Sequence, residues 1–179
     1  MKYERYQELL VSSDFLEYEF MSIGPKGDIL KIIRFTYMDD EAILNLELGN
    51  KNADRSIDDL ARDNNKDRDK ILATVVEALK VFFDQYPGKW VFISGSTPAR
   101  TRLYRMAITL NLEELSTEFE IIGALTERST YKEGTFQKGI NYFGFYVQRK
   151  KRNFKKQYKI LLYEENRSPE SSNGKKADY

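Results

Sequence analysis

The chain has 179 residues, which is long enough for one domain with a substantial hydrophobic core. Hydrophobic residues make up 41% and aromatic residues 13%, and this composition excludes a wholly disordered chain. Cysteine and histidine are both absent. The sequence therefore excludes disulfide scaffolds, zinc sites built on cysteine or histidine, and catalysis by Ser–His–Asp or Cys–His arrangements.

The N-terminal residues, MKYERYQELL, lack the apolar core of a secretory signal peptide. No stretch of the sequence approaches the ~18 continuous apolar residues that a membrane helix needs. We therefore expect a soluble cytoplasmic protein that has no membrane partner.

The net charge of +1 hides an uneven distribution. Residues 149–159 hold seven basic and no acidic side chains, and the rest of the chain is net acidic. A net acidic body argues against a protein that binds nucleic acid over the whole surface of its domain.

The N-terminal third predicts three strands. Residues 15–23 alternate apolar and acidic side chains, as a half-buried strand does. A turn of glycine and proline at residues 24–28 leads into a second strand over residues 29–37. Alternation over residues 42–48 predicts a third strand, and the polar residues 49–66 form the longest predicted loop.

The middle of the chain predicts two helices with a strand between them. Residues 67–86 place apolar side chains at helical spacing, with acidic residues in the first turn. Residues 89–94 form a short apolar run, typical of a buried strand. A second helix is predicted over residues 97–111, with Thr97 as its N-cap and Pro98 as its first residue.

Two more strands are predicted after the second helix, over residues 118–126 and 141–148. The sequence thus predicts one α+β domain over residues 1–150, with a mostly antiparallel sheet of six or seven strands and two main helices packed on it. Residues 151–163 are predicted to be a basic extension, and a further strand is an option within it. Residues 164–179 have the composition of a disordered tail.

The junction between the buried strand and the second helix is the strongest candidate site. Free backbone N–H groups and the helix dipole attract anions to a helix N-terminus, and the arginines that follow add positive charge. The predicted anion-binding residues are Ser96, Thr97, Arg100, Arg102 and Arg105. The alternative is structural: Thr97 only caps the helix, and the arginines pair with loop carboxylates such as Asp58, Asp59 or Asp63. The glycine spacing of a P-loop is absent.

The basic segment is a second candidate, because basic charge releases counterions from a phosphate backbone and aromatic rings stack on bases. Its predicted nucleic-acid contacts are Arg149, Lys150, Lys151, Arg152, Lys155 and Lys156, with Phe154 and Tyr158 interleaved. The alternative is a run of lysines that keeps a strand edge soluble.

Two further clusters favour a structural interpretation. The acidic loop holds several aspartates that could bind Mg²⁺ or Ca²⁺. Basic residues interleave with them and the EF-hand spacing is absent, so we expect a solvated loop and no metal or other cofactor. The four aromatic residues Tyr142, Phe143, Phe145 and Tyr146 are expected in the core, and a base-stacking platform is the alternative.

No pair of catalytic residue types stands at a diagnostic spacing, so a non-catalytic binding module is favoured. Its partner would be a phosphate-bearing ligand, a nucleic acid, or a protein encoded nearby. The alternative is a small enzyme acting on a phosphodiester, such as a ribonuclease-like toxin of a toxin–antitoxin pair. In that case arginines would stabilise the transition state, and Tyr104 or a loop carboxylate would serve as base.

Three blocks of the sequence carry a resemblance: SIGPKG at residues 22–27, DRDKILATV at residues 67–75 and GSTPARTRLYRM at residues 95–106. Together they resemble a family of small uncharacterised bacterial proteins, a domain of unknown function, over residues 12–150. This resemblance implies a bacterial, cytoplasmic setting and no particular mechanism.

Overall fold

A computed structural model describes residues 3–61 and 63–151. Within these ranges the chain forms nine strands and three helices. In chain order they are β1 (Leu10–Val11), β2 (Glu17–Gly24), β3 (Gly27–Tyr37), β4 (Ile43–Lys51), β5 (Ile57–Asp58), α1 (Arg68–Gln85), β6 (Trp90–Ile93), α2 (Pro98–Leu110), α3 (Leu112–Glu118), β7 (Phe119–Glu127), β8 (Thr130–Thr135) and β9 (Gly144–Arg149).

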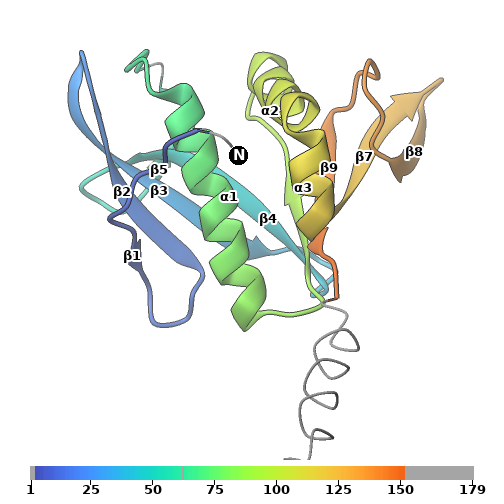
Figure 1. Cartoon of the computed structure of the whole chain (residues 1–179), viewed down its shortest axis with the longest axis horizontal. Coiled ribbons are helices and arrows are strands. Elements are labelled where there is room, and N and C mark those ends of the chain that lie inside the picture. The colour runs from blue at the N-terminus through green and yellow to red at the C-terminus, as the bar shows by residue number, and fades with distance from the viewer. Residues whose placement is uncertain (1–2, 62, 152–179) are drawn as a thin grey trace, which may run out of the picture.

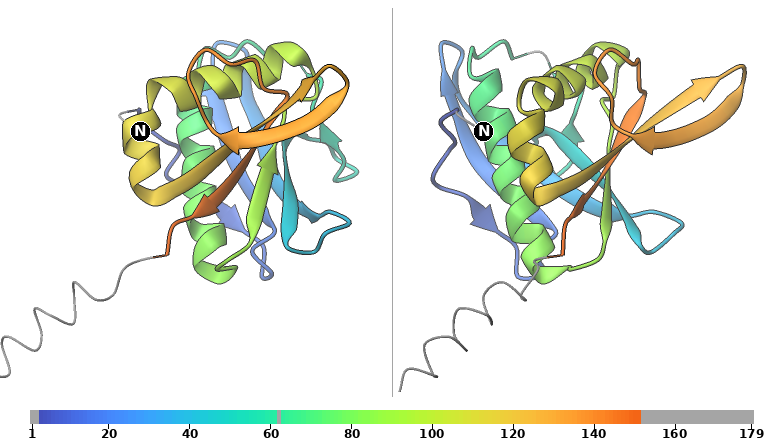
Figure 2. Two further views of the ribbon diagram at one scale, coloured as in Figure 1. Left: turned by 90° about the vertical axis from the view of Figure 1, so that its right-hand side faces the viewer. Right: turned by 45° about the vertical axis from the view of Figure 1, so that its right-hand side comes forward.

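All nine strands belong to one sheet, in the order β1-β2-β3-β4-β6-β9-β7-β8, with β5 paired to β4 (Figures 1 and 2). Every pair is antiparallel except β4 with β6, which run parallel. The long connection that contains α1 joins these two strands, as a parallel pair requires. The predicted α+β class and mostly antiparallel sheet are confirmed.

The predicted number of strands, six or seven, is wrong, because the described residues alone form nine. The additional strands are β1, β5 and β8. Two of these have only two residues, and every residue of β8 is exposed. None therefore shows the apolar alternation that identifies a strand in a sequence. The short helix α3 was also not predicted. The strand considered over residues 157–163 and the tail over residues 164–179 lie outside the described residues.

The two predicted helices are present with nearly the expected bounds. The apolar face of α1 buries seven side chains, and the helix ends where Tyr86 donates its backbone N–H to the carbonyl of Phe82 at 2.9 Å. Gly88 follows with a φ of 86°, a conformation that glycine adopts at little cost. Local spacing and the end signal together fix this helix.

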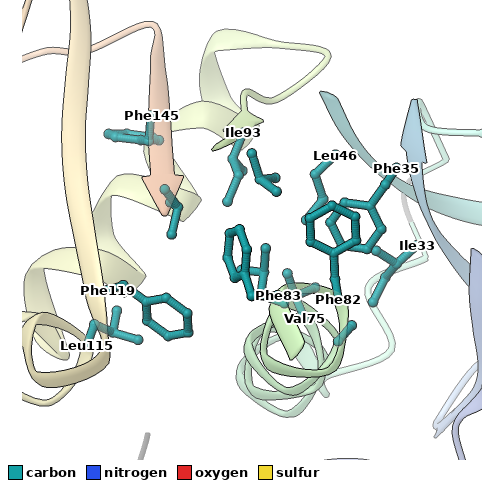
Figure 3. Close-up of a cluster of buried hydrophobic side chains, with 14 of the residues drawn as sticks. Ile33, Phe35, Leu46, Val75, Phe82, Phe83, Ile93, Leu115, Phe119 and Phe145 are labelled. Carbon is teal, nitrogen blue, oxygen red and sulfur yellow. The ribbon is translucent and has the colours of Figure 1, made fainter. Parts of the chain in front are cut away.

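One hydrophobic cluster joins the helices to the sheet (Figure 3). Phe82 of α1 stacks on Phe35 of β3 with ring centroids 4.2 Å apart. Leu115 of α3 and Phe119 of β7 extend the same cluster to the other end of the sheet. None of the described helices combines the length and hydrophobicity that crossing a membrane requires.

The parallel pair determines where a site can form. Because β4 and β6 run in the same direction, their carboxyl ends meet at one edge of the sheet. Open sheets with parallel strands bind ligands in crevices at such an edge. The chain leaves β6 there and turns into α2, and α1 begins at the same end of the molecule (Figure 1).

Candidate functional site

A cleft of about 1010 Å³ lies at the carboxyl ends of β4 and β6. Its walls are the first turns of α1 and α2, together with the loop that follows β5. Its apolar lining includes Leu48, Leu60, Ile71, Leu72, Leu103 and Tyr104. Its polar lining includes Lys31, Asn50, Asp63, Thr97 and Arg100. A volume of this size with mixed lining is typical of a small-molecule site.

Thr97 and Pro98 begin α2 as predicted. Thr97 has an extended backbone, and its hydroxyl accepts the backbone N–H of Arg100 at 3.3 Å. Pro98 takes the first helical position, where a missing N–H costs nothing. The N-cap therefore orients the first turn of α2 along the wall of the cleft.

Arg100 joins the loop to the helix. Its guanidinium donates to the hydroxyl of Ser96 at 3.3 Å and to the backbone carbonyl of Ala61. Ser96 in turn donates to the backbone carbonyl of Asp59 at 2.9 Å. The alternative interpretation paired the arginines with loop carboxylates. Within the described residues, the Arg100 guanidinium bonds only neutral oxygens and no carboxylate.

The predicted arginines do not all gather in the cleft. Arg105 donates to the carbonyl of Ile140 at 3.3 Å and to the side chain of Asn141, away from the cleft lining. Arg102 is exposed and makes no hydrogen bond or ion pair with another described residue. Ser96, Thr97 and Arg100 thus lie together, and Arg102 and Arg105 lie apart from them.

A polar triad that the sequence analysis did not single out forms the floor of the cleft. Lys31 of β3 and Asn50 of β4 stand directly opposite one another in the sheet. Lys31 donates to both Asn50 and Asp63, and the amide of Asn50 donates to Asp63 at 2.8 Å. Strand alternation could have indicated that Lys31 is buried, because it lies on the same face of β3 as the buried Ile33 and Phe35.

The electrostatics of this floor keep Asp63 ionised. Burial by itself raises the pKa of the Asp63 carboxyl, but the hydrogen bonds from Lys31 and Asn50 outweigh it. The positive charges of Lys31 and Arg100 act in the same direction, and the resulting pKa lies below the ordinary value. Asp63 thus places an ionised carboxylate on the floor of the cleft, whose lining also includes the acidic residues Glu4, Asp58, Asp67 and Asp69.

Tyr104 contributes a half-buried phenol to the cleft lining. Burial raises the pKa of Tyr104 to about 12, although the nearby charge of Arg100 opposes the shift. The phenol is therefore protonated at neutral pH, where it can donate a hydrogen bond but cannot act as a base.

The described part of the basic segment is largely engaged within the protein. Arg149 donates to Asp84 at 2.5 Å and to the carbonyl of Lys80 at 3.1 Å, and its side chain is only 15% exposed. Lys150 donates to the carbonyl of Ser116 at 2.5 Å, and Lys151 is exposed. The other predicted nucleic-acid contacts lie outside the described residues, namely Arg152, Lys155 and Lys156.

Among the described residues, neither the carboxylates of the acidic loop nor the four aromatic residues gather into one group. Within residues 3–61 and 63–151, no three acidic side chains come close enough to hold a metal ion. Tyr142 and Phe145 lie in the core as expected. Tyr146 and the exposed Phe143 contact Phe92 instead, with centroid distances of 4.8 and 6.4 Å. Strand alternation does not explain this division, because Tyr142 and Phe145 are three residues apart and Tyr142 and Phe143 precede β9.

Comparisons with known proteins give one match. A family model described as "Family of unknown function (DUF6934)" covers residues 2–150. This agrees with the resemblance to an uncharacterised family, and the matched range stops just before the basic extension. A search of curated proteins and a search of solved structures each found no match.

Proposed function

Since the chain belongs to this family of unknown function, we propose a function from the cleft itself: the protein is a binding module for a small ligand that carries a phosphate group. The observation that supports this most directly is the bonding of Arg100. Its guanidinium lines the cleft and, within the described residues, donates only to neutral oxygens of Ser96 and Ala61. A half-buried cation without a bonded carboxylate favours an anionic ligand.

The rest of the lining narrows the class of ligand. Leu60, Leu72 and Leu103 give the walls apolar surface on three different segments. Inorganic phosphate alone would leave this surface in contact with water. A nucleotide fits better, because it joins a flat base with apolar faces to a phosphate that Arg100 can bind in a bidentate manner.

The two cleft groups with shifted pKa values, Tyr104 and Asp63, favour binding over phosphodiester chemistry. A general base works best with a pKa near the operating pH. The pKa of Tyr104 is raised to about 12 by burial, and the pKa of Asp63 is lowered by its hydrogen bonds with Lys31 and Asn50 despite its burial. Tyr104 is therefore too weak an acid, and Asp63 too weak a base, for proton transfer at neutral pH.

Isothermal titration calorimetry with three probes tests the proposal: inorganic pyrophosphate, a set of nucleoside monophosphates, and a short single-stranded oligonucleotide. The first two report a free phosphate ligand, and the third reports a nucleic-acid phosphate. Arg100→Ala is expected to weaken binding about tenfold or more, since a hydrogen bond to a charged group contributes about 1.5–3 kcal/mol. Arg100→Lys should give intermediate binding, because it keeps the charge but loses the bidentate geometry.

Arg102→Ala is the matched control, because Arg102 lies on the same helix, is exposed, and does not line the cleft. It should bind the probes as the unmodified protein does. Equal losses in the two alanine variants would contradict the proposal. A lower melting temperature of Arg100→Ala without any binding of the probes to the unmodified protein would leave Arg100 with a structural role alone.

A further inference from the structure

The carboxylate of Asp63 sits inside the cleft on donors that belong to the sheet. Lys31 donates to one carboxylate oxygen of Asp63, and Asn50 donates to the other at 2.8 Å. The side chain of Lys31 is 9% exposed and that of Asp63 is 16% exposed. Both carboxylate oxygens are thus held at a position with little access to solvent.

The donors are fixed more firmly than the acceptor. Lys31 and Asn50 are direct partners in the β3–β4 ladder, and Lys31 also donates to the amide oxygen of Asn50. Asp63 comes instead from the polar loop, and it enters the cleft from outside the sheet. The sheet therefore presents a preformed pair of donors, and the loop supplies the group that occupies them.

This pair of donors suits a phosphate as well as a carboxylate. Two oxygens of a phosphate can accept the two hydrogen bonds that Asp63 now accepts. The position also lies within the electric field of Arg100, which acts on the Asp63 carboxyl. A phosphate would bring further oxygens that a second cation can bind.

We infer that Asp63 is an internal anion that occupies the phosphate position of the cleft, and that a ligand binds by displacing it from Lys31 and Asn50. This inference rests on the proposed function, since it assigns the phosphate subsite of the same ligand. Asp63 and a phosphate cannot share the position, because two anions in contact repel strongly where water is scarce. Binding then includes the cost of moving Asp63, and the measured affinity is lower than the affinity of the vacated subsite.

Asp63→Asn in the full chain is the direct test. The variant keeps the size of the side chain and one acceptor oxygen but removes the charge that competes with the ligand. The dissociation constants of inorganic pyrophosphate and of the nucleoside monophosphates, measured by calorimetry at neutral pH, are expected to fall about tenfold.

Asp59→Asn is the matched control. It removes one negative charge from the same loop, and the Asp59 carboxylate makes no hydrogen bond or ion pair with another described residue. It should change the dissociation constants by no more than about twofold, the scale of a screened charge effect. Equal tightening in Asp59→Asn and Asp63→Asn would overturn the inference, because a general change in charge would then explain both.

A double variant, Lys31→Met with Asp63→Asn, checks that the gain belongs to this subsite. It removes both charges of the buried pair, so no buried charge is left unpaired and the protein should still fold. We expect it to lose the tenfold gain while its melting temperature confirms a folded state. Retention of the gain without Lys31 would overturn the assignment of Lys31 as a phosphate donor.

The outcomes separate this inference from the proposed function. If the unmodified protein binds the probes and Asp63→Asn binds them equally well or more weakly, the inference fails and the proposed function stands. If neither the unmodified protein nor Asp63→Asn binds any probe, both fail together. Tight binding in Asp63→Asn with weak binding in the unmodified protein supports both.

Discussion

Gly95 donates its backbone N–H to the hydroxyl of Thr101 at 3.0 Å and lies so close to it that no side chain fits between them. A Cβ atom built on Gly95 would stand 2.4 Å from the backbone nitrogen of Thr101 and 2.7 Å from the carbonyl carbon of Arg100. The segment that follows β6 and the first turn of α2 are therefore in direct backbone contact beside the cleft.

The first prediction follows from this contact. Gly95→Ala should lower the free energy of unfolding by about 1–3 kcal/mol, because the new methyl group meets backbone atoms that cannot move cheaply. Denaturant unfolding measures the loss. Gly134→Ala is the control, since nothing lies within 4 Å of a Cβ built there. Similar losses in both variants would show that the close approach at Gly95 does not matter.

Removing the hydroxyl of Tyr18 should stabilise the protein. The ring is fully buried, and its hydroxyl oxygen has no hydrogen-bond partner among the described residues. A buried polar group without a partner costs about 1–3 kcal/mol, so Tyr18→Phe should recover about 1 kcal/mol of that cost. Thermal and denaturant unfolding both report the change. A clear loss of stability would instead indicate that the hydroxyl bonds an ordered water molecule.

The pH dependence of stability should contain a contribution from Asp63. Burial raises the pKa of its carboxyl, but the hydrogen bonds from Lys31 and Asn50 lower the pKa by more than burial raises it. The pKa in the folded state therefore lies below the ordinary value of 3.8. Stability from this group is then complete above about pH 5 and is lost as the pH falls below the ordinary pKa and through the lowered one.

The stability of Asp63→Asn should therefore fall less than that of the unmodified protein as the pH is lowered below about pH 5. We expect the melting temperature of the variant to change less than that of the unmodified protein between about pH 5 and pH 2.5. The comparison is made by differential scanning calorimetry across that range. Parallel curves for the two proteins would mean that the Asp63 carboxyl has the same pKa in the folded and unfolded states.

Arg149 should behave as a structural residue. It connects β9 to α1 through Asp84 and the carbonyl of Lys80, and a second nitrogen of its guanidinium lies 3.9 Å from Glu118. Arg149→Ala should lower stability by about 1–2 kcal/mol, since two hydrogen bonds to a mostly buried cation are lost. The exposed Lys151, changed to alanine, should have little effect. Unchanged stability in Arg149→Ala, with loss of oligonucleotide binding, would return Arg149 to the nucleic-acid interface.

Local signals in the sequence determined the two long helices, the longer strands and the cap of α2. Apolar spacing identified α1, and Thr97 followed by Pro98 identified the start of α2 within one residue. Alternation identified β2 and β4, and the turn at residues 24–28 indicated β3 after it. These features depend on residues at most a few turns apart, so their physical causes are already present in a short stretch of chain.

The tertiary structure decided which of these elements meet. Lys31, Asn50 and Asp63 are 13 to 32 residues apart in sequence, and only the register of β3 on β4 and the path of the loop bring them together. The same is true of the parallel pairing of β4 with β6, which opens the cleft at their carboxyl ends. Arg100 and Arg105 stand on the same helix, and their sequence positions do not distinguish their roles. The segments packed around α2 place Arg100 in the cleft and pair Arg105 with Asn141. Pairing across long separations depends on the packing of the whole chain, because no local pattern contains the energy of contacts between distant segments.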